Sequence, residues 1–392
     1  MIKRRVLHFI RKSTQLRASF INNQISHHLD FEPFIVFREN KSKLNDGGFA
    51  DFNLKEYNCL DLSENETIKE KIRFKTIKTL SKKQLLLIED FIKKNEIDVC
   101  HFHYGTDCGI FYPLLKKLMV PSLVSFYGYD CSSFPSYLLG FGRKYLQTRV
   151  FKRISAVLAM SPDMKTDLIK AGCPEGKIIV HYHGIDSKRF FHNPEYSEKQ
   201  KITLLILANL VPQKGHLFLL ESIKQLLEKG TTNFELRIIG VGELELKLKK
   251  YVEKNNLSDF VSFKGKIKYA SDDMINEYQN ADIFVLPSVI APNGDKEGIP
   301  GTVVEAMSAG IPVISTCHAG IPYIIESGKT GLLVAEYDYD ALTLAIQQLM
   351  QNRDLREKIG KAGQEYALQH LDIEDKEREL EEIYKRFMIV DS

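Results

Sequence analysis

Residues 297–316 read EGIPGTVVEAMSAGIPVIST. The Gly- and Pro-rich start predicts a loop, TVVEAMSA predicts a helix that ends at Gly310, and PVIST predicts a short buried strand. A Gly-rich loop that leads into a helix offers free backbone N–H groups and a positive dipole end, which suit a phosphate or diphosphate. Glu297 and Glu305, separated by seven residues, repel phosphate, so we expect them to bind hydroxyls. The stretch therefore indicates a site for a nucleotide-sugar.

The bulk composition fits two ordinary α/β domains. The chain has 392 residues, of which 44% are hydrophobic. No apolar run approaches the ~20 residues of a membrane span, and the basic start is followed by an apolar run too short for a signal peptide. None of the six cysteines forms a C-x-x-C pair, which favours reduced thiols in a cytoplasmic protein.

Short apolar runs alternate with helical patterns along the whole chain, which predicts parallel sheets with helices on both faces. The expected strands are RVLHFI, FIVF, DVCHFH, PSLVSF, AVLAMS, KIIVHYH, ITLLILAN, FELRIIG, VSFKGKI, DIFVLPS and IPVIST. The expected helices include 82–94, 164–171, 216–229, 243–254 and 272–279. The polar stretch 189–201 predicts a boundary between domains 1–190 and 200–370. Residues 371–392 predict a charged C-terminal helix that could pack on either domain, including back on the first.

Charge is unevenly divided between the two halves. Residues 1–195 carry 31 Lys/Arg and 21 Asp/Glu, a net of +10, whereas residues 196–392 carry 23 and 30, a net of −7. A basic first half suits an anionic partner such as a membrane surface, a phosphorylated lipid or nucleic acid, or it reflects only a Lys-rich surface. Nucleic acid ranks last, because no aromatic-rich basic motif of a known reader is present.

Four predicted strands of the second half end in residues suited to a ligand. Lys214 and Gly215 stand at the start of the predicted 216–229 helix, and Gly240 and Gly242 allow a ligand close to the backbone. Lys266 and Ile267 follow the third strand, and the fourth leads to Glu297. Ligands of parallel sheets bind beyond the carboxyl ends of the strands, so we expect one site at this edge.

The second half resembles the donor domain of retaining glycosyltransferases of family 4, which have the GT-B fold. The resemblance rests on NLVPQKG, GVGELELKL, ADIFVLPS, the E-x7-E pair and AGIPYIIESGKTGLLV, in family order over roughly residues 200–370. The first half matches more loosely, through HFHYG, SFYGYD, SPDMKTDL and HGID. This resemblance implies two Rossmann-like domains that face each other across a cleft, and bacterial surface-polysaccharide enzymes are the most similar group.

The resemblance also implies roles for the donor-site residues. Glu297 would contact the donor sugar, Glu305 the ribose, Lys214 the departing diphosphate, and the Lys266–Ile267 backbone the base. Backbone groups of the loop would meet the sugar and diphosphate, and these belong to Gly298, Ile299, Pro300, Gly301 and Thr302. No metal and no cofactor is expected. The D-x-D at Asp338–Asp340 is interpreted as a helix cap.

The sequence departs from the family pattern at two places. Asn209 stands where relatives carry an Arg that contacts the diphosphate, and Lys266, Lys268 or His216 could replace that cation. Tyr127 stands where relatives carry a His that faces the reacting carbon. His103 is therefore a candidate catalytic residue, since His101 and His103 point to one face of a strand. The remaining candidates for the cleft and the acceptor are Tyr127, Asp130 and His183.

The first strand is followed by a loop with Arg11, Lys12 and Arg17 rather than paired glycines. We hypothesise that this loop serves an anionic acceptor or a membrane surface. The expected activity is retaining transfer of a sugar from a UDP- or GDP-sugar to a hydroxyl of a glycan or lipid-linked glycan, at the inner face of the plasma membrane. The alternatives are a non-catalytic relative that binds nucleotide-sugar or a partner enzyme, a glycosyl phosphorylase and, disfavoured by the E-x7-E pair, an epimerase.

Overall fold

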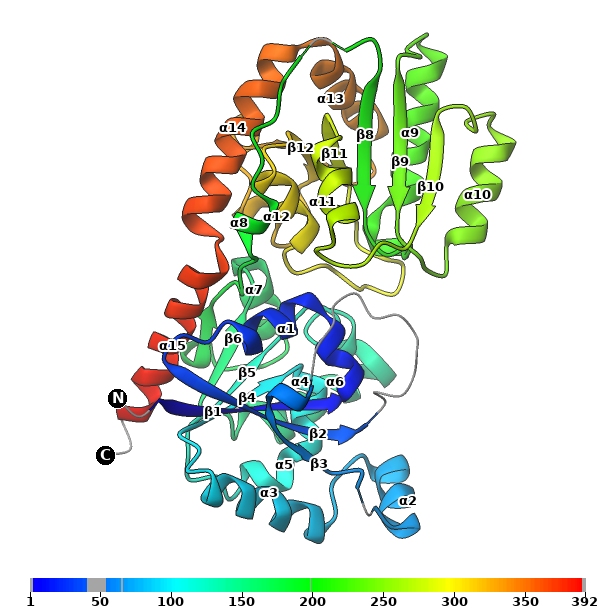
Figure 1. The fold of residues 1–392 in the computed structure, drawn as a ribbon. Coiled ribbons are helices and arrows are strands. Elements are labelled where there is room, and N and C mark those ends of the chain that lie inside the picture. The colour runs from blue at the N-terminus through cyan, green and yellow to red at the C-terminus, as the bar shows by residue number, and fades with distance from the viewer. Residues whose placement is uncertain (1–2, 41–53, 65, 198, 390–392) are drawn as a thin grey trace. The chain divides into compact units, whose positions relative to one another are not determined.

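The computed structural model describes residues 3–40, 54–64, 66–197 and 199–389, and the chain divides into two compact units. Unit 1 comprises residues 1–184 and 373–392, and unit 2 comprises residues 185–372 (Figure 1). The sequence predicted the boundary within 189–201, whereas the contacts divide between Gly184 and Ile185. Within the described ranges, no helix is both long and apolar enough to cross a membrane.

Unit 1 is built on a parallel sheet in the order β3-β2-β1-β4-β5-β6-β7. Its strands are β1 Arg4–Lys12, β2 Phe31–Glu39, β3 Asn58–Asp61, β4 Val99–His103, β5 Ser122–Ser125, β6 Ala156–Ala159 and β7 Ile178–Val180. Its α-helices are α1 Ser19–Ser26, α2 Ile68–Ile77, α3 Lys82–Lys94, α4 Gly105–Cys108, α5 Tyr112–Leu115, α6 Tyr137–Leu146, α7 Pro162–Lys170 and α15 Ile373–Ile389. Helix α3 has the predicted bounds, because Ser81 and Gln84 form a capping box before it.

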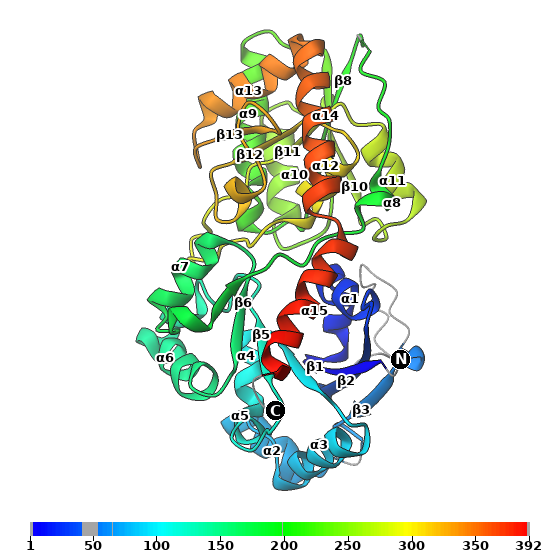
Figure 2. The same ribbon diagram turned by 90° about the vertical axis from the view of Figure 1, so that its left-hand side faces the viewer.

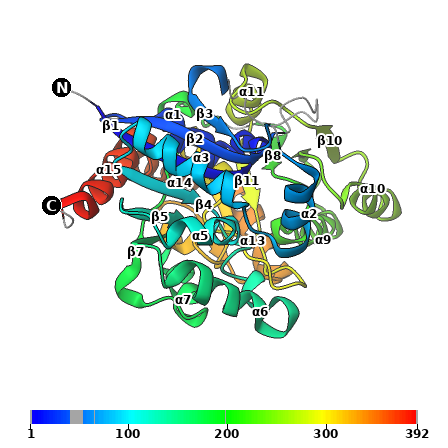
Figure 3. The same ribbon diagram turned by 90° about the horizontal axis from the view of Figure 1, so that it is seen from below.

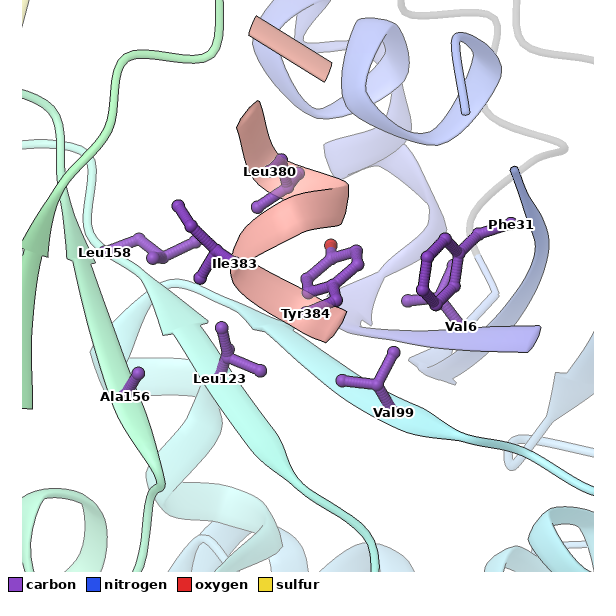
Figure 4. Packing of buried hydrophobic residues seen from close by; sticks show 9 residues of the cluster. All are labelled: Val6, Phe31, Val99, Leu123, Ala156, Leu158, Leu380, Ile383 and Tyr384. Atoms are coloured by element: carbon purple, nitrogen blue, oxygen red, sulfur yellow. The ribbon is translucent and has the colours of Figure 1, made fainter. Parts of the chain in front are cut away.

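The helices of unit 1 cover both faces of its sheet. Helices α3 and α5 lie over one face (Figure 3), and α15 lies beside α1 on the other (Figure 2). From α15, Leu380, Ile383 and Tyr384 enter a core that they share with the sheet (Figure 4); the sheet contributes Val6, Phe31, Val99, Leu123, Ala156 and Leu158. The C-terminal helix is therefore part of the first unit's core.

Unit 2 contains the second parallel sheet, in the order β10-β9-β8-β11-β12-β13. Its strands are β8 Ile202–Leu207, β9 Phe234–Ile239, β10 Val261–Gly265, β11 Ile283–Leu286, β12 Val313–Thr316 and β13 Leu332–Val334. Its α-helices are α8 Ser187–Phe190, α9 His216–Glu228, α10 Glu245–Lys254, α11 Asp272–Gln279, α12 Gly301–Ser308, α13 Tyr339–Gln351 and α14 Arg353–His370. Asp338 caps α13 by accepting the N–H of Ala341, as predicted for the D-x-D.

Two parallel α/β sheets confirm the predicted fold class, and each predicted strand is present. The sequence interpretation missed β3 and β13. Both are edge strands of three or four residues with partly exposed side chains, so neither produces a distinct apolar run.

Candidate functional site

In unit 2, the loops after β8, β9 and β10 are joined at the carboxyl edge of the sheet. The N–H of Gly240 donates to the carbonyl of Gly265, and the N–H of Leu210 donates to the carbonyl of Val241. Gly240 has φ +146°, and a Cβ there would lie 1.9 Å from the carbonyl oxygen of Ala208. The close contact therefore requires glycine, and it holds Asn209, Gly240, Gly242, Lys266 and Ile267 at neighbouring strand ends.

The turn before α9 positions Lys214. Gly215 adopts φ +69°, and a Cβ there would lie 1.8 Å from the carbonyl oxygen of Pro287, beyond the end of β11. Glycine therefore lets the β8–α9 turn pack against the loop that carries Glu297. The Nζ of Lys214 lies 2.8 Å from Oε2 of Glu297, and both side chains are mostly buried.

A histidine that the sequence interpretation missed holds the backbone of Glu297. The N–H of Glu297 donates to Nε2 of His318 (3.1 Å), and His318 Nδ1 lies 2.7 Å from a carboxylate oxygen of Glu336. Since Nε2 accepts, the ring proton is on Nδ1, where it donates to Glu336. His318 follows β12 as Lys214 follows β8, so the strand-end rule could have identified it.

The N-terminus of α12 supplies the predicted anion-binding geometry. Pro300 is the N-cap, and Gly301 and Thr302 begin the helix, so their N–H groups have no partner within it. Gly298 accepts the N–H of Gly320, which fixes the loop ahead of the helix. Ile299 is buried beneath this loop. The free N–H groups and the helix dipole together favour a negatively charged ligand at this point.

Glu305 lies buried on α12, and its Oε2 accepts the hydroxyl proton of Tyr278 at 2.7 Å. Burial raises the pKa of Glu305 to about 7, while the Tyr278 hydrogen bond and the charge of Lys214 oppose that rise. A Cβ at position 301 would come within 3.6 Å of Oε1, so glycine leaves the second carboxylate oxygen less covered. Lys214 thus lies close enough to both glutamates to influence each.

The candidates for a second cation beside Lys214 are Lys266, Lys268 and His216. Asn209 is exposed and neutral, and Lys266 and Lys268 are exposed beyond β10. His216 is buried at the start of α9, where burial and the charge of Lys214 lower its pKa to about 3. The suggestion that His216 replaces the missing cation is therefore wrong, because its ring is neutral near pH 7.

In unit 1, the candidates at the ends of β4 and β5 are tied together. Asp130 is buried and accepts the N–H groups of Gly105, Tyr127 and Gly128, so it braces two loops. His103 is fully buried, and its Nδ1 lies 2.6 Å from the hydroxyl of the part-exposed Tyr127. Of these side chains, that of Tyr127 is the least buried, but its hydroxyl is bonded to His103 and Gln24.

The remaining candidates of unit 1 have local partners. The guanidinium of Arg11 lies 3.2 Å from the buried carboxylate of Asp107, which also accepts a hydrogen bond from Gln15. His183 donates from Nδ1 to the carbonyl of Gly184, and burial lowers its pKa to about 4. Both side chains therefore serve local structure in unit 1.

Potential metal ligands gather only in unit 1 among the residues that the structure describes. One group is His8, His101 and His103, and the other is His28, Glu377 and Glu381. Neither group includes a residue of the Lys214–Glu297 pair or of α12.

Both units match models of glycosyltransferase families. Residues 187–366 match the family model described as "Glycosyl transferases group 1", and residues 68–189 match "Glycosyltransferase Family 4". "Putative colanic acid biosynthesis glycosyltransferase WcaL" of Escherichia coli is 36% identical over 249 residues, which cover 62% of this chain and 59% of that protein. "Amylovoran biosynthesis glycosyltransferase AmsK" of Erwinia amylovora is 34% identical over 257 residues, covering 65% and 61%.

The aligned part thus spans about three fifths of the length of these relatives. Among solved structures, HepE of Anabaena in complex with UDP and glucose has a TM-score of 0.74 at 16% identity, and covers 97% of this chain and 99% of that one. At this identity the likeness concerns the fold, and it agrees with the predicted GT-B class.

Proposed function

We propose that the chain transfers a sugar from a nucleotide-diphosphate-sugar to a hydroxyl of a glycan or lipid-linked glycan. It belongs to the glycosyltransferases, because the group 1 and family 4 models match its two units. The observation that carries this proposal is the Lys214–Glu297 pair beside the N-terminus of α12, with Glu305 one turn inside that helix. A cation, free N–H groups and two carboxylates match the diphosphate and the hydroxyls of such a donor.

The chemistry of the leaving group fits these residues. When the bond between the sugar and the diphosphate breaks, negative charge develops on the phosphate oxygens. Lys214 and the α12 N-terminus can stabilise that charge where it forms, without a metal ion. In the proposed reaction, donor turnover therefore persists in a chelator such as EDTA.

We further propose that the sugar keeps its anomeric configuration. A double displacement needs a carboxylate free to attack the anomeric carbon, but Glu297 is paired with Lys214, which weakens it as a nucleophile. A same-face reaction assisted by the leaving phosphate is the better fit. Proton NMR of the first product formed from an α-linked donor tests it, since a β-linked product would contradict retention.

The relatives named for colanic acid and amylovoran biosynthesis support a role in surface polysaccharide synthesis. The complex of HepE with UDP and glucose supports a UDP-sugar donor, while a GDP-sugar remains the second candidate. A panel of UDP- and GDP-sugars with the full chain and its Glu297→Ala variant tests the enzyme. Turnover that is lost in the Glu297→Ala variant supports transfer. Nucleotide binding without turnover of any donor supports the non-catalytic alternative. Turnover that requires free phosphate as acceptor supports a phosphorylase.

An exposed apolar segment of unit 1 suits a lipid surface. Leu138, Leu139 and Phe141 are 63%, 103% and 71% exposed; the first two lie in the kinked, non-helical start of α6, and Arg143 and Lys144 follow in the helix. Apolar side chains beside cations match the interface of an anionic membrane. We therefore locate the proposed membrane contact here rather than at the Arg11 loop, since Arg11 is paired with Asp107.

Sedimentation with phosphatidylglycerol vesicles tests this contact. Leu139→Asp should weaken binding at least tenfold, and phosphatidylcholine vesicles should bind poorly. Leu344→Asp, at an exposed leucine of α13 in unit 2, serves as the control. Equal binding of the two variants would contradict the assignment.

A further inference from the structure

A buried polar cluster lies where α15 packs against α1 and the loop that follows it (Figure 2). It consists of His28 from that loop and of Glu377 and Glu381, which stand one helical turn apart on α15. At most 2% of each side chain is exposed. Each side chain offers one ligand atom, and these atoms lie within 4.8 Å of one another. The cluster therefore holds one nitrogen and two carboxylates away from water, a donor set that suits a divalent metal ion.

The contact between His28 and Glu377 is not a hydrogen bond. Nδ1 of His28 lies 2.5 Å from Oε1 of Glu377 and 3.5 Å from Oε1 of Glu381. Despite this closeness, neither Nδ1 nor Oε1 of Glu377 has a hydrogen-bond partner among the described residues, so the two atoms are not aligned as donor and acceptor. Buried polar atoms are nearly always hydrogen-bonded, and two such atoms side by side require an explanation. Lone pairs that converge on a third point, where an ion binds, provide one.

The charges in the cluster favour a divalent cation. Among the described residues, the ion-pair partner of both Glu377 and Glu381 is His28 alone, since the partly exposed Lys385 of the same helix pairs with Asp30 at the surface. One imidazolium between two carboxylates leaves a buried negative charge, which is costly, whereas Zn²⁺ with a neutral imidazole leaves none. In the metal-free chain a proton takes the place of the ion: burial lowers the pKa of His28, but Glu377 and Glu381 outweigh burial and raise it to about 9.

The surroundings of the three side chains match those of metal ligands. A metal ion on Nδ1 of His28 requires the ring proton on Nε2, which lies 2.8 Å from Nε2 of the fully buried His8, and that nitrogen can accept it. The carboxylate of Glu381 accepts the backbone N–H groups of residues 29–31. These three bonds orient the carboxylate and leave one of its about four acceptor sites for the ion. Metal ligands are usually held by such an outer set of hydrogen bonds.

The neighbouring group of three histidines fits a metal ion less well. Both ring nitrogens of His101 are already engaged, by the hydroxyls of Tyr384 and Ser125. Nδ1 of His8 lies 3.0 Å from Nε2 of His103, so these two nitrogens face each other rather than a common point. Metal ligation requires lone pairs that converge on one point, which leaves the cluster on α15 as the better candidate.

We propose that His28, Glu377 and Glu381 bind one Zn²⁺ ion, which fastens the C-terminal helix α15 to the loop after α1. Two ligands of a tetrahedral zinc lie about 3.4 Å apart, so the ion would widen the contact of His28 with Glu377 and keep that with Glu381. Helix α15 completes the core of unit 1, so the ion would stabilise the segment on which this core depends. The ion takes no part in sugar transfer, and this proposal does not rest on the proposed function. Its loss lowers the stability of unit 1 and not the rate of donor turnover.

Metal analysis of the full chain tests the site without any activity. After growth with added zinc chloride and dialysis against metal-free buffer, the chain should retain one zinc ion per molecule. Zinc-edge X-ray absorption should show nitrogen and oxygen ligands at about 2.0–2.1 Å. A chain that retains no zinc would overturn the proposal, and so would sulfur ligands at about 2.3 Å, which would come from the free cysteines.

Two matched substitutions on α15 locate the ion. Glu377→Gln removes a charged ligand with little change of shape, so it should weaken zinc binding about 100-fold or more. Glu382→Gln removes a charge from an exposed position of the same helix and should leave zinc binding unchanged. Zinc should also raise the melting temperature of the original chain and of Glu382→Gln, but not that of Glu377→Gln. Equal zinc affinity of the two variants would overturn the assignment, and if Glu377→Gln does not fold, X-ray absorption of the original chain decides it.

Discussion

Lys214 and Glu297 are 83 positions apart in the sequence, yet Nζ of the first lies 2.8 Å from Oε2 of the second. The contact joins the turn after β8 to the loop before α12, and it places opposite charges where a phosphate ester and a sugar would meet under the proposed function.

Replacing Lys214 should slow turnover of the donor. Lys214→Ala removes a cation from developing phosphate charge, so kcat should fall about 10²- to 10³-fold, as for loss of one strong stabilising donor. Release of nucleoside diphosphate measures the rate. Lys247→Ala, at an exposed lysine of α10, provides the control, and a Lys214→Ala rate within twofold of the original would contradict the role.

Restoring the family's cation should help the leaving group. Asn209 is exposed after β8, so an arginine can be accommodated there without disturbing the core. We expect Asn209→Arg to raise kcat about tenfold if departure of the diphosphate limits the rate, and Asn209→Gln to leave kcat unchanged. A slower arginine variant would indicate that the neutral residue suits this donor.

The buried carboxyl of Glu305 predicts a pH-dependent stability. Its pKa is raised from 4.5 to about 7, so its contribution is present below pH 4.5 and is lost as pH rises through 7. Glu305→Gln should therefore raise the free energy of unfolding at pH 8 by up to about 3 kcal/mol, and by little at pH 4.5. Equal effects at both pH values, measured by urea unfolding of the two proteins, would contradict the assigned ionisation.

His28 predicts a pH dependence in unit 1 with its own window. Its pKa is raised from 6.5 to about 9, so the stability from its pairing is complete below pH 6.5 and is lost as pH rises through 9. Glu377→Gln should cost about 3 kcal/mol at pH 6, since it removes one partner of a buried pair, and less at pH 9.5. A cost that does not change with pH, in the same unfolding experiment, would show that His28 is not the charged partner.

The sequence predicted the fold and the meeting of loops at the carboxyl edge of the second sheet well, because those features follow from local patterns. Strand–helix alternation located eleven strands, and glycine and lysine at strand ends marked the loops that the structure joins. Hydrogen bonds between residues far apart in the sequence could not be predicted from it. Nothing local links His28 to Glu377 or Glu297 to His318, since those pairs depend on which elements become neighbours.

The acceptor candidates illustrate the same limit. His103 was a catalytic candidate because it is a histidine at the end of a strand. Its burial and its hydrogen bond to Tyr127 depend on how β1, β4 and α15 pack together, which the sequence does not show. Asp130, a candidate for the cleft or the acceptor, is buried and braces two loops, which the sequence did not indicate. The replacement of a cation by Asn209 stays a prediction from the motif, and it does not depend on packing.

The packing of α15 constrains how the chain matures during synthesis. Leu380, Ile383 and Tyr384 complete the core of unit 1, yet they are translated after the whole of unit 2. Unit 2 can therefore acquire its fold on the ribosome while unit 1 still exposes part of its apolar sheet. Unit 1 is thus the first unit to be synthesised and the last to complete its fold. A nascent chain arrested near residue 372 would expose apolar surface that chaperones bind.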